Sequence, residues 1–226
     1  MNVTTRHTPS FAVARVELAP GESIKAESGA MMATSAGIEI EAKMQGGLMK
    51  GLKRSVLGGE SLFVTTYRAG DAGGWVDVAA RLPGDVTTIQ LDGGAVNIAK
   101  GGWLCSGADI ELDTQWGGFK SVLGGEGGFL IHAHGSGPVV IACYGALDTI
   151  ELAHGESVVV DSGHVVAFDP DVQFTTRKVT KGLMTTLKSG EGLVMEFTGP
   201  GRVMTQTRSP ADLIGWLTAV LPFSRS

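Results

Sequence analysis

The hexapeptide Ser-Val-Leu-Gly-Gly-Glu occupies residues 55–60 and returns unchanged at residues 121–126. A weaker copy, Leu-Lys-Ser-Gly-Glu, occupies residues 187–191, so the Gly-Glu pairs of successive copies lie 66 and then 65 residues apart. Each copy also has a glycine at an equivalent position, five residues after an apolar residue. The pairs are Ile24 and Gly29, Val96 and Gly101, and Val158 and Gly163. Self-similarity at a nearly fixed period predicts that one supersecondary unit occurs three times along the chain.

Within each unit, apolar and polar residues alternate with a period of two. The segments 38–44 (IEIEAKM) and 110–116 (IELDTQW) alternate in the same phase, and residues 172–174 begin a third version. Such alternation is typical of β-strands with one face on a core and the other in water. A second strand is predicted after each Gly-Glu pair, and a glycine-containing turn and a return strand follow it.

These features predict an all-β protein of three tandem β units around a pseudo-threefold axis, followed by a short C-terminal helix. The predicted bounds are residues 13–85, 86–148 and 149–208 for the units and 209–222 for the helix, within a single compact domain of residues 1–226. A unit of about 65 residues is marginal alone and exposes sheet edges. Three units can cover one another's sheet edges, which favours a single compact domain over three separate domains.

The end of the chain departs from the β pattern. Ser209 has the character of a helix N-cap, Pro210 suits the first turn, and Asp212 places an acid there. The apolar residues that follow fall on one helical face, and a helix this short needs a surface to dock on. We expect that surface to be the protein's own sheet, with a neighbouring subunit as the second possibility. A membrane surface is disfavoured because no Lys or Arg occurs between Pro210 and Ser224.

Composition excludes several classes of protein. Glycine accounts for 34 of the 226 residues, charged residues for 18% and hydrophobic residues for 43%, with a net charge of −5. Disorder requires lower hydrophobicity and higher charge, and collagen requires glycine at every third position. The acidic balance does not favour a nucleic-acid partner.

The termini and cysteines bear on location and chemistry. The first ten residues lack the pattern of a signal peptide, and no apolar run approaches the roughly 20 residues of a membrane span. We therefore expect a cytoplasmic protein. Cys105 and Cys143 are the only cysteines, and we expect both to be free, buried thiols.

The chain resembles the mitochondrial biogenesis family, whose bacterial members have no established activity. The resemblance runs from about Val13 to Leu221; its most specific part is Lys-Gly-Leu-Lys-Arg at residues 50–54, within the longer match at residues 46–63. It implies three tandem units, each similar to a subunit of the trp RNA-binding attenuation protein, a shortened double-stranded β-helix. It also implies a homo-oligomer, a trimer, and, for the mitochondrial relatives, an association with inner-membrane organisation.

Positive charge is concentrated in the three loops that precede the Gly-Glu pairs. If a threefold axis relates the units, these loops gather at one end, where they could attract phosphate-bearing ligands or anionic lipid headgroups. The alternative is that they are solvated loops that keep the protein soluble. The residues proposed for anion binding are Lys50, Lys53, Arg54, Lys120, Lys178 and Lys181.

Two further groups have a chemical and a structural interpretation. Glu60, Glu126 and Glu191 occupy equivalent places and could bind a cation near an axis or shift one another's pKa values. The favoured interpretation is that each closes its own turn by accepting backbone hydrogen bonds, because structural repetition alone explains their recurrence. His132 and His134 share a strand face, as metal ligands do in cupins, yet the glutamate that would complete such a site is absent. A solvent-facing pair is the favoured interpretation.

We therefore expect a non-catalytic, homo-oligomeric scaffold or ligand-binding protein without a cofactor. No nucleophile elbow, metalloprotease helix, paired Cys-x-x-Cys or dinucleotide fingerprint occurs in the sequence. The first rival hypothesis is a cupin-like metalloenzyme that uses His132 and His134. The second rival is an RNA-binding ring, which only the fold relatives suggest.

Overall fold

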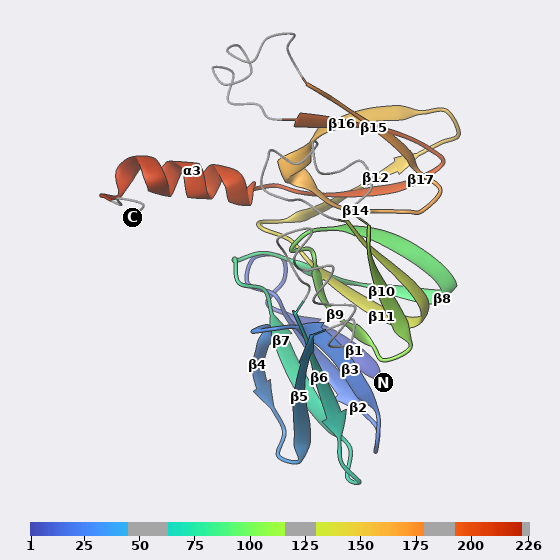
Figure 1. Ribbon diagram of the computed structural model, residues 1–226, viewed down its shortest axis with the longest axis vertical. Coiled ribbons are helices and arrows are strands. Elements are labelled where there is room, and N and C mark those ends of the chain that lie inside the picture. Colours follow the sequence, from blue (N-terminus) through green and yellow to red (C-terminus); the bar gives the residue numbers. More distant parts are fainter. Residues whose placement is uncertain (45–62, 116–129, 179–192, 223–226) are drawn as a thin grey trace.

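The structure is a computed structural model that describes residues 1–44, 63–115, 130–178 and 193–222 (Figure 1). Its described residues are mostly β-strand, with one α-helix near the C-terminus. The predicted all-β class with a short C-terminal helix is therefore confirmed. The strands form three successive blocks, which lie one above another in Figure 1 with the N-terminal block lowest.

The first block combines a four-stranded sheet with one end of a larger sheet. The four-stranded sheet has the order β1-β2-β7-β4, while β3 and β5 both pair with β6. The strands of the first block are β1 (Asn2–Arg6), β2 (Val13–Leu18), β3 (Ser23–Glu27), β4 (Met31–Thr34), β5 (Ile38–Met44), β6 (Phe63–Ala69) and β7 (Gly74–Ala79).

The second block repeats this pairing with longer strands. One half of β8 and one half of β11 pair as β2 and β7 do, and their other halves pair as β3 and β6 do. β9 adds to β11 as β4 adds to β7, and β10 adds to β11 as β5 adds to β6. The strands are β8 (Val86–Ala99), β9 (Trp103–Gly107), β10 (Ile110–Gln115) and β11 (Leu130–Ala142).

The third block shows the same pairing again. β12 and β14 flank β17, and β13 and β15 flank β16. Its elements are β12 (Leu147–Leu152), β13 (Ser157–Asp161), the 3-10 turn η2 (Ser162–His164), β14 (Val165–Phe168), β15 (Gln173–Lys178), β16 (Leu193–Thr198) and β17 (Gly201–Gln206).

Two joints of the same kind link the blocks. β9 of the second block pairs with β3 of the first, and β14 of the third block pairs with β8 of the second. A large sheet thus passes through all three blocks, in the order β12-β17-β14-β8-β11-β9-β3-β6-β5. Among the residues the structure describes, no strand pairing joins the first block to the third. The pseudo-threefold axis therefore stays a prediction.

The hydrophobic core continues across both joints. Leu104 and Cys105 of β9 belong to the apolar cluster of the first block, and Val166 and Ala167 of β14 belong to that of the second. A separate cluster under the third block contains Leu130 of β11. Burial of the larger of these side chains, Leu104, Val166 and Leu130, contributes roughly 1.5–3 kcal/mol each, so each block stabilises its neighbour.

The predicted alternating strands are present, with one difference. β10 buries Ile110 and Leu112 and exposes Glu111, as its alternation predicts. β5 matches the predicted bounds, yet Ile40 is 53% exposed rather than buried. β5 is the outermost strand of its sheet, and the described residues cover only about half of the Ile40 side chain.

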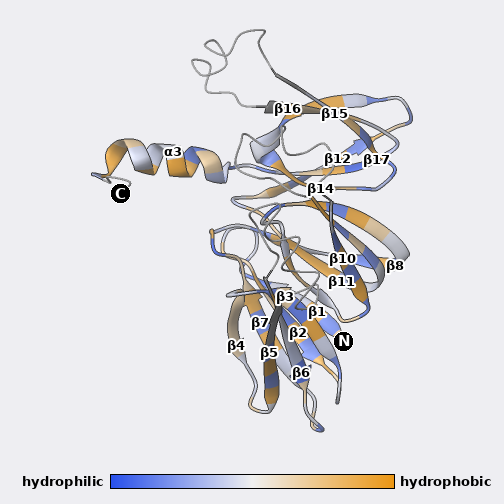
Figure 2. Cartoon of the chain, viewed as in Figure 1, coloured by the Kyte–Doolittle hydropathy of each residue, from blue (hydrophilic) through white to orange (hydrophobic). Residues whose placement is uncertain are grey.

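The C-terminal helix α3 (Pro210–Val220) begins as predicted but does not pack as predicted. The Ser209 hydroxyl accepts a hydrogen bond from the Asp212 N–H at 3.3 Å, which caps the first turn. No residue of the helix is buried, and Ile214, Trp216 and Val220 are between 55% and 61% exposed. Figures 1 and 2 show α3 extending away from the sheets with apolar residues along it. The prediction that it docks on the protein's own sheet is therefore wrong.

None of the described helices is long and apolar enough to cross a membrane.

A buried carboxylate ties together three strands of the first block. Asp77 on β7 is 2% exposed and accepts hydrogen bonds from Arg6 on β1 and from Arg15 on β2, the shortest of each being 2.8 Å. The Arg15 guanidinium also stacks over the ring of Trp75, at 3.9 Å from its centroid. Hydrogen bonds from Arg15, and then from Arg6, lower the pKa of Asp77 from 3.8 to about 2.

This lowered pKa predicts a specific acid sensitivity. The stabilisation by ionised Asp77 is complete above pH 3.8 and is lost as the pH falls through about 2. Asp77→Asn should lower the free energy of unfolding at pH 7 by about 2 kcal/mol and should remove this part of the acid dependence. Urea unfolding of wild type and variant between pH 2 and pH 7 measures both effects. Asp148→Asn, on the exposed face of β12, is the control and should behave as wild type.

Candidate functional site

The predicted anion-binding residues lie almost entirely outside the described ranges. Lys178 is the exception: it ends β15 and its backbone pairs with Leu193 of β16. The carboxylates Glu60, Glu126 and Glu191 also fall outside these ranges. Whether the basic loops form one surface therefore stays a prediction. The anion-binding role of the five residues outside the described ranges also stays a prediction; they are Lys50, Lys53, Arg54, Lys120 and Lys181.

His132 and His134 lie on one face of β11, as predicted, with ring centroids 5.5 Å apart. His132 Nδ1 hydrogen-bonds to Asn97 Oδ1 at 2.9 Å, and His134 Nε2 lies 3.2 Å from Asp113 Oδ2. Within the part of the chain that the structure describes, no group of three or more His, Cys, Asp or Glu side chains could hold a metal. The described residues therefore contain no metal-binding cluster of the kind that the cupin-like hypothesis requires.

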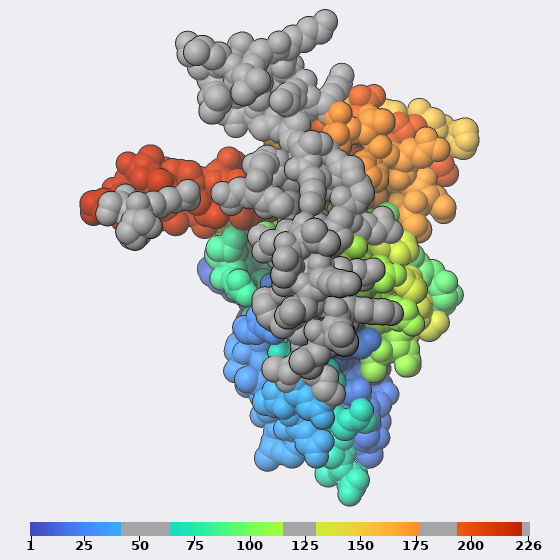
Figure 3. All heavy atoms as spheres, in the orientation of Figure 1, coloured from blue at the N-terminus to red at the C-terminus, as the bar shows by residue number. Residues whose placement is uncertain are grey.

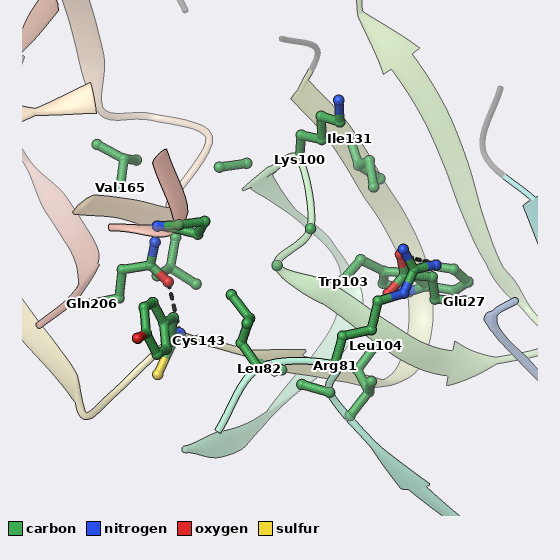
Figure 4. Close-up of a pocket in the computed structure, with 18 of the residues that line it drawn as sticks. Glu27, Arg81, Leu82, Lys100, Trp103, Leu104, Ile131, Cys143, Val165 and Gln206 are labelled. Atoms are coloured by element: carbon green, nitrogen blue, oxygen red, sulfur yellow. Dashed lines mark hydrogen bonds and ion pairs between the residues drawn. The ribbon is translucent and has the colours of Figure 1, made fainter. Parts of the chain in front are cut away.

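A candidate ligand-binding site is a cleft of about 910 Å³ beside the N-terminal end of α3. All three blocks contribute to it: Arg81 and Leu82 from the connection after β7, Trp103 from β9, and Val165 from β14. Figure 4 shows Val165 and Gln206 on the opposite side of the cleft from Trp103. Because the walls come from segments far apart in the chain, the cleft exists only when the blocks are joined.

The cleft combines apolar walls with one ion pair. Its apolar lining includes Leu82 and Val165, with Trp103 beneath the surface, and Ile214 of α3 lines it too. The Arg81 guanidinium lies 3.9 Å from the Glu27 carboxylate, and the two side chains meet next to Trp103 (Figure 4). Burial raises the pKa of Glu27, and Arg81 counteracts this rise. An exposed cation at the edge of an apolar cleft can receive the charged end of an amphipathic ligand.

In the cleft wall, both polar atoms of the Gln206 side-chain amide form hydrogen bonds. Gln206 Nε2 donates to the Gly163 carbonyl at 2.9 Å, and Oε1 accepts from the Tyr144 N–H at 2.8 Å. His164 Nδ1 lies 2.7 Å from the Gln206 carbonyl oxygen. This side chain is therefore a fixed part of the cleft wall, with its own polar atoms already engaged.

Trp103 is the unusual residue of the cleft. It is 1% exposed, and its indole N–H has no hydrogen-bond partner among the described residues. An unpaired buried donor costs about 1–3 kcal/mol, which the apolar packing of the ring must offset. Nothing in the sequence marked Trp103 or Arg81 as functional.

Both cysteines are buried and free, as predicted. Burial raises the pKa of the Cys105 thiol to about 12. The Cys143 thiol donates to the Gly145 carbonyl at 3.3 Å, and burial raises its pKa as well. A thiol reacts as its thiolate, so neither cysteine is poised as a nucleophile.

The comparisons with known proteins agree with one another. A family model described as "Mitochondrial biogenesis AIM24" matches residues 3–208. The uncharacterized protein M6_Spy0233 of Streptococcus pyogenes serotype M6 is 27% identical over 233 residues, covering 99% of this chain and 92% of that protein. The crystal structure of protein SPYM3_0169 from Streptococcus pyogenes superposes with a TM-score of 0.82 at 23% identity, covering 97% of this chain and 99% of that one.

The burial of the thiols predicts that both are protected in the folded protein. Ellman's reagent at pH 8 should modify neither Cys105 nor Cys143 on a timescale of minutes, whereas both should react at once in 6 M guanidinium. The variant Thr88→Cys introduces an exposed thiol on β8 and should react immediately without denaturant. Rapid labelling of the native wild type would show that a thiol is accessible and reactive.

Proposed function

The chain belongs to the mitochondrial biogenesis AIM24 family, and on that premise we propose that it is a non-catalytic, homo-oligomeric binding protein. Its ligand in this proposal is an anionic amphiphile, such as a fatty acid, bound in the cleft beside α3. The observation that carries the proposal is the cleft itself, at about 910 Å³, with apolar walls and Arg81 at its edge. Small-molecule sites typically have volumes of about 300–1,000 Å³ and walls of this character.

The position of Arg81 supports an anionic headgroup. Its side chain is 75% exposed, and its ion pair with Glu27 spans 3.9 Å, longer than a direct hydrogen bond. A carboxylate or phosphate ester could therefore pair with the guanidinium without displacing a buried contact. Leu82, Val165 and Ile214 would then lie along the hydrocarbon part.

Homo-oligomerisation is supported by apolar surface that the protein's own body leaves uncovered. Trp216 of α3 is 61% exposed and Val220 is 55% exposed. Exposed apolar patches commonly mark protein–protein interfaces, in which tryptophan is enriched. We propose a cytoplasmic trimer, in which each chain consists of three units at residues 13–85, 86–148 and 149–208. The threefold recurrence of the strand pairing supports that division.

The basic loops form a second part of the proposal. Lys50, Lys53 and Arg54 fall in the segment that the family resemblance marks as most specific, and we propose that they dock anionic headgroups. Each basic residue near an anionic membrane contributes roughly 1 kcal/mol. The cleft and the loops would then select the same chemistry, a negatively charged amphiphile.

The cleft hypothesis is tested with dodecanoate as the probe, below its critical micelle concentration, by isothermal titration calorimetry. Wild type should bind it, and Arg81→Ala should weaken binding about 5–10-fold because an exposed charge-assisted contact is lost. Arg81→Lys should recover part of the affinity. Arg68→Ala removes an exposed arginine on β6 outside the cleft and is the matched control.

Two results would count against the cleft. Absence of binding by the wild type would overturn it as an amphiphile site. Equal affinities of wild type and Arg81→Ala would show that Arg81 does not receive the headgroup.

The basic loops are tested with the triple variant Lys50→Ala, Lys53→Ala, Arg54→Ala. We expect wild type to co-sediment with vesicles containing 30% phosphatidylserine, with an affinity that falls as salt is raised. The triple variant should lose this binding, and neither protein should bind neutral phosphatidylcholine vesicles. Lack of salt-sensitive binding by the wild type would refute the headgroup proposal.

A further inference from the structure

Each joint between blocks pairs a strand edge of one block with a strand edge of the next. At the first joint, Ala26 of β3 lies opposite Cys105 of β9. Ala26 stands three residues before Gly29, and Cys105 stands four residues after Gly101. These two glycines occupy equivalent places in the repeat, so the joint has a definable register.

The second joint has the same register. Ile98 of β8 lies opposite Ala167 of β14. Ile98 stands three residues before Gly101, and Ala167 stands four residues after Gly163. The two joints are thus one structural solution used twice, in which the strand before the repeat glycine pairs with the strand after the glycine of the next block.

This rule leaves one matching edge unused at each end of the chain. β4, which follows Gly29, pairs only with β7, and β13, which precedes Gly163, pairs only with β16, as far as the described strands show. β4 is in the first block and β13 is in the third, at opposite ends of the stack in Figure 1. A single chain therefore presents both halves of a third joint, too far apart to meet within one molecule.

The two free edges carry few of the charges, and none of the prolines, that commonly protect strand edges. Natural edge strands are commonly protected by charged side chains or by proline. β4 reads Met-Met-Ala-Thr and carries no charge. β13 reads Ser-Val-Val-Val-Asp, and its one carboxylate, Asp161, accepts a hydrogen bond from the Gly163 N–H. In contrast, the outer strand β5 carries Glu39, Glu41 and Lys43.

A bulged residue shows what the third joint would bury. In β9 and in β14 the ladder skips one residue, Leu104 and Val166 respectively. Leu104 is 1% exposed and Val166 is 2% exposed, because each inserts into the core of the preceding block. β4 has the same bulge at Met32, which has no preceding block and is 53% exposed.

We propose that β4 of one copy pairs with β13 of a second copy, so that the chains assemble head to tail and Met32 inserts into the core of the partner's third block. The inference rests on the homo-oligomer of the proposed function and specifies its contact. Continuing the register of the two joints places Ala33 opposite Val160, and Thr34 opposite Val159. A head-to-tail contact closes into a ring when the rotation per copy divides a full turn, which is compatible with a trimer.

Intermolecular cross-linking tests the register directly. Thr34→Cys and Val159→Cys are made in separate full-length proteins, mixed and oxidised, and a disulfide-linked mixed dimer is expected on a non-reducing gel. Val159 is 46% exposed, so its substitution leaves the fold intact. Thr88→Cys mixed with Val159→Cys is the matched control, with a thiol on β8 away from either edge, and should give no mixed dimer.

Light scattering tests the inserted methionine. Met32→Lys places a charge where the contact needs an apolar side chain, and should shift the oligomer to the 23.4 kDa monomer. Phe11→Lys replaces another exposed apolar residue, 70% exposed and outside both edges, and should leave the assembly unchanged. Circular dichroism confirms that each variant is folded.

The outcomes separate this inference from the homo-oligomer itself. An oligomeric wild type whose assembly survives Met32→Lys, without the Thr34–Val159 cross-link, would overturn the edge pairing and leave the homo-oligomer standing. A wild type that stays monomeric at all concentrations would overturn both. Cross-linking together with dissociation of Met32→Lys would support the head-to-tail contact.

Discussion

The unpaired N–H and C=O groups at the edge of a β-sheet need hydrogen-bond partners, and this structure depends on how that need is met. Each block supplies an edge strand to its neighbour, first through β3 and β9 and then through β8 and β14. At each joint a bulged apolar residue enters the neighbour's core, so backbone pairing and hydrophobic burial act at the same place. One large sheet therefore runs through all three blocks and joins them, so they are not three independent units.

The cleft beside α3 is a consequence of these joints. Trp103 and Leu104 lie on β9, and Val165 and Val166 lie on β14, so the joint strands themselves supply cleft walls. The connection that carries Arg81 leads from the first block to the second and lines the same cleft. α3 leaves the body there too and projects from the space-filling surface in Figure 3.

The titratable and nucleophilic groups discussed above are buried or engaged in hydrogen bonds. The thiols are buried with raised pKa values, and the two histidines of β11 are hydrogen-bonded to Asn97 and Asp113. Where a charge is buried, at Asp77, it is neutralised by two arginines and ties strands together. The mitochondrial biogenesis AIM24 family and the uncharacterised streptococcal relative name no reaction for such a site.

Sequence alone determined the strand class, the bounds of β5, the capped start of α3 and the burial of both cysteines. Alternation and capping are local patterns, set by residues a few positions apart. Only the tertiary structure decided what covers each apolar face: Ile40 is exposed, α3 stands free, and Trp103 lines a cleft. Those outcomes depend on which strand edges meet, as Ala26 and Cys105 do, and a periodic pattern shows that a face is apolar without showing its partner.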